Sequence, residues 1–84
     1  MTQNAEILTY LLRHKDITPL DALATFGCMR LGARIWDLRH RYGVHIQRET
    51  KTVKTRNGTA DVASYSLLDK QSALKALEVM KETA

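Results

Sequence analysis

The chain lacks a second cysteine and a long apolar run. Its one cysteine, Cys28, rules out an internal disulfide and a cysteine-based zinc site. No apolar run approaches the roughly 18 residues that a membrane span needs. The opening run Met1-Thr2-Gln3-Asn4 is polar rather than basic and then apolar. We therefore expect no signal peptide, no membrane partner and a reducing cytoplasmic compartment.

Motifs for catalysis and for cofactors are missing as well. His14, His40 and His45 share no metal-ligand spacing. The chain contains no glycine-rich phosphate loop, no acidic cluster suited to magnesium and no evident Ser/His/Asp set. We therefore expect a binding protein rather than an enzyme, with neither a cofactor nor a metal site.

The basic residues of the chain are concentrated in its middle. The 84 residues, 44% of them hydrophobic, suit one globular domain with a small core. Between Met29 and Gly58 there are two acidic residues, and the rest of the chain has seven acidic and five basic ones. This distribution is typical of a protein that binds a phosphate backbone, although a solvated charged face would look similar. The eight basic residues of this stretch are Arg30, Arg34, Arg39, Arg41, Arg48, Lys51, Lys54 and Arg56.

Two helices are predicted before the basic stretch. Apolar residues at helical spacing indicate a first helix over about residues 4–14, with Thr2 or Asn4 as its cap. Thr18-Pro19-Leu20-Asp21 is a helix-start signal, because threonine caps, proline suits the first turn and aspartate complements the helix dipole. We expect this second helix to run from Pro19 to about Phe26, to bury Leu20 and Leu23, and to end at Gly27.

A third helix is predicted from Met29 to Arg41, with Gly43 after its end. Its apolar residues Leu31, Ile35 and Leu38 form one stripe, and basic residues form a second stripe roughly a quarter turn away. One stripe can pack in a core while the other faces an anion. A short helix, a glycine turn and a cationic helix are the layout of a helix-turn-helix.

A β-hairpin is predicted next, because Val44–Arg48 alternates apolar and polar residues and Asn57-Gly58 is a strong signal for a type I′ turn. Folding about that turn places Val44, Ile46, Tyr65 and Leu67 on one face and leaves a basic outer half. The predicted cross-strand pairs are Val53 with Val62, Thr50 with Tyr65, Arg48 with Leu67, and Lys54 with Asp61.

A last helix is predicted from Lys70 to about Glu82, with Asp69 as its cap. Its apolar stripe consists of Ala73, Leu74, Leu77 and Met80. This stripe either packs on its own chain or forms a dimer interface, and the sequence leaves both open.

These elements predict an α+β fold, a winged helix-turn-helix with three helices, a β-hairpin wing and an extra C-terminal helix. The expected division is a winged unit over residues 1–68 and the helix over residues 69–84. The stretch from Thr18 to Leu67 resembles a family of small phage and prophage winged-helix proteins. The motifs that carry the resemblance are Thr18-Pro19-Leu20-Asp21-Ala22-Leu23, Gly27-Cys28-Met29-Arg30-Leu31-Gly32-Ala33-Arg34-Ile35-Trp36-Asp37-Leu38-Arg39 and Tyr42-Gly43.

This resemblance implies binding of double-stranded DNA inside a bacterial host, as a transcriptional regulator or as an accessory factor for recombination with an integrase as partner. A homodimer or cooperative assembly on DNA would add binding surface. The alternative is a phage protein that uses the fold to bind and inhibit a host protein. Asp21 departs from the glutamate that the family often has there.

The candidate DNA-binding residues lie on the third helix and the hairpin. Arg30 and Arg34 are placed to reach base edges, although Arg34 could instead pair with Asp37. Arg41, like Arg39, could bind phosphate or complement the helix dipole. Trp36 is expected to pack on a neighbouring element, with partner contact as the alternative, and Gly32 suggests a close approach. The full set of candidates is Met29, Arg30, Ala33, Arg34, Arg41, Lys51, Lys54 and Arg56.

Overall fold

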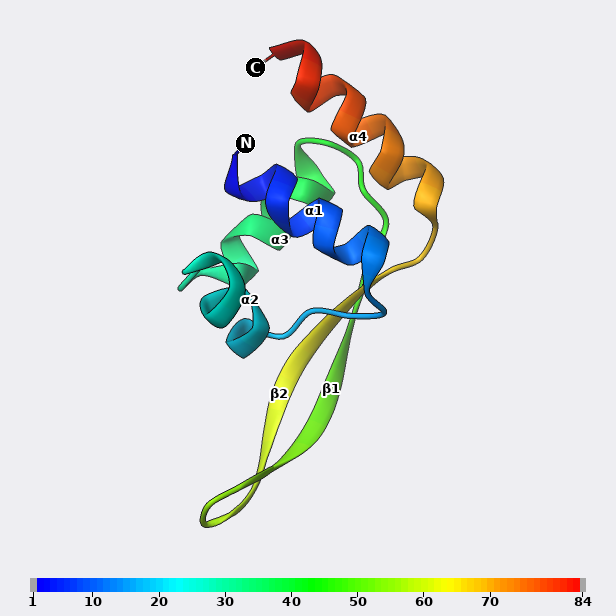
Figure 1. Cartoon of the computed structure of the whole chain (residues 1–84). Helices are drawn as coiled ribbons and strands as arrows, with labels where there is room; N and C mark the ends of the chain where they lie inside the picture. Colours follow the sequence, from blue (N-terminus) through cyan, green and yellow to red (C-terminus); the bar gives the residue numbers. More distant parts are fainter. Residues whose placement is uncertain (1, 84) are drawn as a thin grey trace.

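The computed structural model describes residues 2–83, so the outer domain limits at Met1 and Ala84 lie outside the described residues. Three helices cluster together, a long hairpin extends away from them, and a fourth helix returns to lie beside α1 (Figure 1). No helix in the described part of the chain is both long and apolar enough to cross a membrane. The elements are α1 (Gln3–Arg13), α2 (Pro19–Phe26), α3 (Leu31–His40), β1 (Ile46–Thr55), β2 (Gly58–Leu67) and α4 (Lys70–Thr83).

Side chains cap three of the helices at their first turns. The Oγ1 atom of Thr2 accepts from the backbone of Ala5 at 3.2 Å, which identifies Thr2 rather than Asn4 as the cap of α1. Thr18 and Asp21 exchange hydrogen bonds of 3.2 and 3.1 Å in a capping box at the start of α2. Gly27 then ends α2 at a φ of 66°, a left-handed conformation that glycine adopts without strain.

The core lies where the helices meet the inner end of the hairpin. The Leu31, Ile35 and Leu38 stripe of α3 is buried as predicted. The other buried hydrophobic residues come from α1, the α1–α2 and α2–α3 connections, α2, the start of the hairpin and α4. They are Ala5, Ile7, Leu8, Leu11, Ile17, Ala22, Cys28, Val44, Ile46, Ala73, Ala76 and Met80.

The predicted burial of α2 was wrong, because Leu20 is 73% exposed and Leu23 is 47% exposed. This short helix directs Ala22 and Phe26 inward, and Phe26 packs edge-on against Tyr10 with ring centroids 5.7 Å apart. At about 100° per residue, Leu20 lies roughly 160° from Ala22 around the helix. Both leucines remain at the surface, on the side of α2 that faces the hairpin.

The hairpin register differs from the predicted one by two residues. Thr55 pairs with Gly58, so the loop consists of Arg56 and Asn57, and both have negative φ instead of the positive values of a type I′ turn. Val53 consequently lies opposite Ala60, and Tyr65 opposite Arg48. A shift of two preserves the alternation of faces, so the predicted inward face is unchanged.

The inner end of the hairpin explains this register. Ile46 pairs with Leu67, and both belong to or pack on the core. Ile17, between α1 and α2, exchanges backbone hydrogen bonds of 2.8 and 2.9 Å with Tyr65. Burial and these backbone bonds fix the strands at the core, and the turn adapts to them.

Helix α4 packs against α1 through small side chains. Asp69 caps it by accepting from the backbone of Ser72 at 2.8 Å. The predicted stripe was wrong at Leu74, which is 54% exposed, and it missed Ala76, which is buried. Leu74 lies about 100° around the helix from Ala73, outside the arc that faces α1. The helix thus contributes to the core of its own chain.

Candidate nucleic-acid interface

Helix α3 carries basic side chains and is itself held firmly against the core. Three buried side chains fix the helix on one side, so the positions of its exposed residues follow from the helix geometry. Arg30, Arg39 and Arg41 are exposed, and Arg34 is half-buried. The helix therefore presents several guanidinium groups from one rigid support.

Arg34 and Arg41 both approach the carboxylate of Asp37. Nη1 of Arg34 lies 3.9 Å from one carboxylate oxygen, and Nε of Arg41 lies 3.6 Å from the other. The Asp37 side chain is only 16% exposed, whereas that of Arg41 is 70% exposed. The pairing between Arg34 and Asp37 that the sequence left open is thus present, and it aligns two cations along one edge of α3.

Arg30 stands at the start of α3 with φ −129° and ψ 60°, which is not helical. Its carbonyl accepts from Ala33 and Arg34, at 3.1 and 3.3 Å, but its side chain supplies no cap. Among the described residues, its guanidinium has no ion pair. The exposed cation of Arg30 lies at the N-terminal end of α3, where the helix dipole also attracts anions.

Met29 and Cys28, which adjoin in sequence, have opposite environments. Met29 is 85% exposed just before α3, whereas Cys28 is buried in the core. Met29 therefore remains available to a ligand, and Cys28 has a packing role. Ala33, in the first turn of the helix, is half-buried.

Lys51 is tied to the α1–α2 connection instead of standing free on the hairpin. Its Nζ lies 3.3 Å from Oδ2 of Asp16, and the same oxygen accepts from the Ser64 hydroxyl at 2.6 Å. The Ser64 hydrogen bond, with help from Lys51, lowers the pKa of Asp16. Sequence reasoning missed this trio because its members are 35 and 48 residues apart.

Lys54 and Arg56 lie farther along the hairpin and are exposed. The predicted pairing of Lys54 with Asp61 was wrong, since Lys54 lies opposite Thr59. Asp61 instead accepts from the hydroxyl of Thr52 at 2.8 Å. Within residues 2–83 neither cation has an ion pair, so the outer hairpin keeps its positive charge available.

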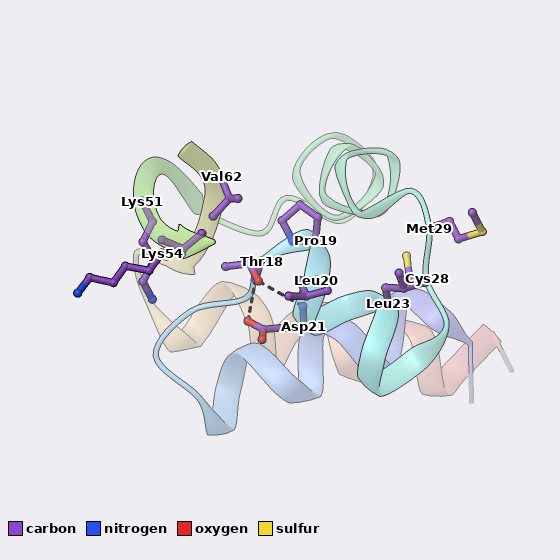
Figure 2. Close-up of a pocket in the computed structure, with 11 residues that line it drawn as sticks. Thr18, Pro19, Leu20, Asp21, Leu23, Cys28, Met29, Lys51, Lys54 and Val62 are labelled. Carbon is purple, nitrogen blue, oxygen red and sulfur yellow. Dashed lines mark hydrogen bonds between the residues drawn. The ribbon is translucent and has the colours of Figure 1, made fainter. Parts of the chain in front are cut away.

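A groove of about 610 Å³ separates α2 and the connection between α2 and α3 from the hairpin (Figure 2). In Figure 2 the hairpin residues Lys51, Lys54 and Val62 lie on one side, and Met29 lies on the other. The exposed leucines of α2 belong to its wall. Its lining is formed by Thr18, Pro19, Leu20, Asp21, Leu23, Cys28, Met29, Lys51, Val53, Lys54 and Val62.

Trp36 was expected to pack on a neighbouring element as part of the core, and the structure places it outside the core instead. It is 54% exposed, and its ring lies on that of His40 with centroids 4.7 Å apart. At i and i+4 the two rings share a face of α3 that points away from the buried stripe. The helical spacing signalled this position, since Trp36 falls outside the apolar stripe.

Gly32 has no packing reason among the described residues. A Cβ atom placed there would meet nothing within 4 Å in that part of the chain, and its φ is not positive. The close approach that the sequence suggested is therefore not made by atoms of residues 2–83. Gly32 lies on the exposed surface of α3.

Comparison with known proteins identifies a family. The family model described as a winged helix-turn-helix domain matches residues 2–70, which includes every element from α1 to the end of the hairpin. No curated protein and no solved structure matches the chain.

Proposed function

The chain belongs to the winged helix-turn-helix domain family, and we propose from this premise that it binds double-stranded DNA in a sequence-specific manner, with a binding rather than a catalytic role. The observation that carries the proposal is the position of the basic stretch, because its cations lie on α3 and on the hairpin. In this fold α3 enters the major groove and the hairpin follows the backbone.

The cations divide into two kinds of contact. Arg30, with no ion pair among the described residues, reaches a base edge near the start of α3, where a guanidinium suits the acceptors of guanine. Arg34 and Arg41 are held by Asp37 and bind phosphates instead. Met29, just before α3, and Ala33, on α3, contact the DNA major groove.

The hairpin supplies contacts that do not depend on base sequence. Lys54 and Arg56 bind phosphates or enter the minor groove. Lys51 contributes from the inner part of the hairpin, where Asp16 holds its ammonium. The hairpin is therefore the wing of the fold.

A second copy of the chain completes the site on DNA. One recognition helix with one wing buries on the order of 600–1,000 Å² of protein, which is small for a specific operator. Leu74 on the outer side of α4 is placed to contact that copy. We expect Leu74→Lys to give a folded monomer without cooperative DNA binding. A wild type that light scattering finds monomeric, both free and on DNA, would contradict this assembly.

The biological role that we propose is that of a phage or prophage regulator, or of an accessory factor in site-specific recombination. The sequence motifs around α2 and α3 support this context. The gene neighbourhood separates the two roles, since an adjacent integrase gene favours the recombination factor and identifies its partner.

The groove between α2 and the hairpin supports a second candidate function, the binding and inhibition of a host protein. Leu20, Leu23 and Met29 expose apolar surface there, and such surface is common in protein interfaces. Leu20→Lys with Leu23→Lys would block a protein partner but add charge that DNA tolerates. Retained DNA binding with lost biological activity would favour this second candidate.

Fluorescence anisotropy with a labelled random duplex tests DNA binding itself. The full chain should bind at low salt and release the duplex as salt increases. Replacement of Lys54 and Arg56 by alanine should weaken that binding. Absence of binding at low salt would refute the proposal.

A further inference from the structure

The outward face of α3 carries little charge. Counting about 100° per residue, the direction opposite the buried stripe passes near Ala33 and His40, and Trp36 lies within about 50° of it. Trp36 is 54% exposed, and Met29 just before the helix is 85% exposed. The part of α3 that would enter deepest into the major groove of DNA is therefore mainly apolar and aromatic.

Arginine side chains flank this outward face. By the same count, Arg39 lies about 110° to one side of its centre, and Arg34 lies about as far to the other. Arg41 joins Arg34 on that second side, where Asp37 aligns both. Flanking cations suit the phosphates that border a major groove, and the face between them suits the base edges on its floor.

An apolar face can recognise one base edge in particular. In the major groove, thymine presents a 5-methyl group, which is the one apolar feature of the four bases there. Alanine and aromatic side chains contact this methyl group well. A protein partner would also accept an apolar face, but arginines on both sides of it complement the two phosphate strands of a duplex.

We propose that α3 reads thymine 5-methyl groups through Ala33 and Trp36, with His40 supporting the indole ring. This inference rests on the proposed DNA binding and adds the base that the helix recognises. The contact between Trp36 and His40, with centroids 4.7 Å apart, holds the indole over the outer surface of α3. Gly32 leaves room beside it, because no Cβ projects there.

Deoxyuridine tests this proposal with the unmodified protein. A duplex is first selected from a random pool by the full chain, and each thymine is then replaced singly by deoxyuridine, which keeps the pairing and removes one methyl group. We expect about a fourfold loss of affinity at each contacted thymine, the size that burial of one methyl group implies.

A Trp36→Ala variant separates a direct contact from an effect on DNA shape. It should bind random duplex nearly as well as the wild type, since its cations are unchanged. On the selected duplex it should be weaker, and it should lose the response to deoxyuridine at the position that Trp36 contacts. Leu68→Ala removes a comparably exposed apolar side chain from the segment between β2 and α4, which has no role in the proposed DNA contacts, and should keep the full response.

The outcomes distinguish this inference from the proposed function. If the wild type binds no duplex, DNA binding and thymine reading both fail. If it binds a selected duplex tightly but an all-deoxyuridine version binds equally well, DNA binding stands and thymine reading is refuted. A Trp36→Ala variant that keeps the whole deoxyuridine response would refute the assignment to Trp36.

Discussion

Helix α3 and the β-hairpin both carry basic side chains, but they hold them differently. Three buried side chains fix α3, and Asp37 orients two of its arginines at 3.9 and 3.6 Å. The hairpin is fixed at its inner end, while its outer cations Lys54 and Arg56 have no ion pair among the described residues. A rigid support suits contacts that depend on geometry, and an extended arm suits contacts that depend on charge.

The two regions differ because their residue patterns differ. Apolar residues at helical spacing give α3 one side to bury. From Arg48 to Arg56 the first strand of the hairpin has Val53 as its one apolar residue. In the outer half of β2, Val62 and Ala63 are partly buried but do not belong to the core cluster, so the outer half of the hairpin projects beyond the core. The molecule is consequently elongated, with extents of 46 × 24 × 21 Å.

The largest effect is expected from removing the charge of the hairpin. Replacing Lys51, Lys54 and Arg56 by alanine should weaken binding to every duplex and make it less sensitive to salt. Each lost phosphate contact should reduce the slope of log affinity against log salt by about 0.9. Titrations at several salt concentrations measure this slope. An unchanged slope would show that the hairpin does not touch DNA.

A smaller and more selective effect is expected at α3. Arg30→Ala should weaken binding to the selected duplex by about 1–3 kcal/mol and relax the preference at one base pair. Arg13→Ala, at the end of α1, is the matched control and should change neither affinity nor preference. Equal losses on selected and random duplexes would make Arg30 a phosphate contact instead.

Local patterns in the sequence predicted most of the fold. The caps at Thr18 and Asp69, the glycine end of α2 and the buried stripe of α3 all depend on residues within one or two turns of each other. The face alternation of the hairpin also followed from the sequence, because it depends only on parity. The candidate cations were identifiable from their concentration in one stretch.

Contacts distant in sequence account for what the sequence missed. The hairpin register is fixed by Ile17 bonding to Tyr65, which lies 48 residues away, and the turn signal alone gave another pairing. Leu23 and Trp36 are apolar residues left outside a small core, and apolar identity alone does not reveal that. The ion pair between Lys51 and Asp16 was also missed because the two residues are distant in sequence.

Substitution of two glycines by alanine tests whether α3 and the hairpin turn require different backbone conformations. Gly32→Ala should stabilise the chain by about 1 kcal/mol, because alanine is the better helix former and its methyl group meets nothing. Gly58→Ala is the matched control and should destabilise it, because Gly58 has φ 137°. Thermal unfolding measures both. A destabilised Gly32→Ala variant would contradict the open space beside Gly32.

The smallest effect concerns the anchored end of the hairpin. Hydrogen bonds from the Ser72 backbone and from His45, at 2.6 Å, lower the pKa of Asp69 to about 2 from a usual 3.8. The unfolded chain therefore binds this proton more readily. The stability contributed by Asp69 is complete above about pH 4 and is lost as the pH falls toward 2.

The Asp69→Asn variant isolates this contribution, because asparagine still caps a helix but does not ionise in this range. Denaturant unfolding between pH 2 and 5 should show a weaker pH dependence in Asp69→Asn than in the wild type. Identical pH profiles would show that Asp69 does not link α4 to the hairpin base through its charge.

The ratio of affinities for selected and random duplexes tests the division of labour between α3 and the hairpin most directly. Measured at one salt concentration for the wild type, the Arg30→Ala variant and the triple hairpin variant, this ratio should fall for Arg30→Ala. For the hairpin variant it should stay near the wild-type value, because its affinities for both duplexes decrease together. A ratio that falls for the hairpin variant and persists in Arg30→Ala would contradict the account.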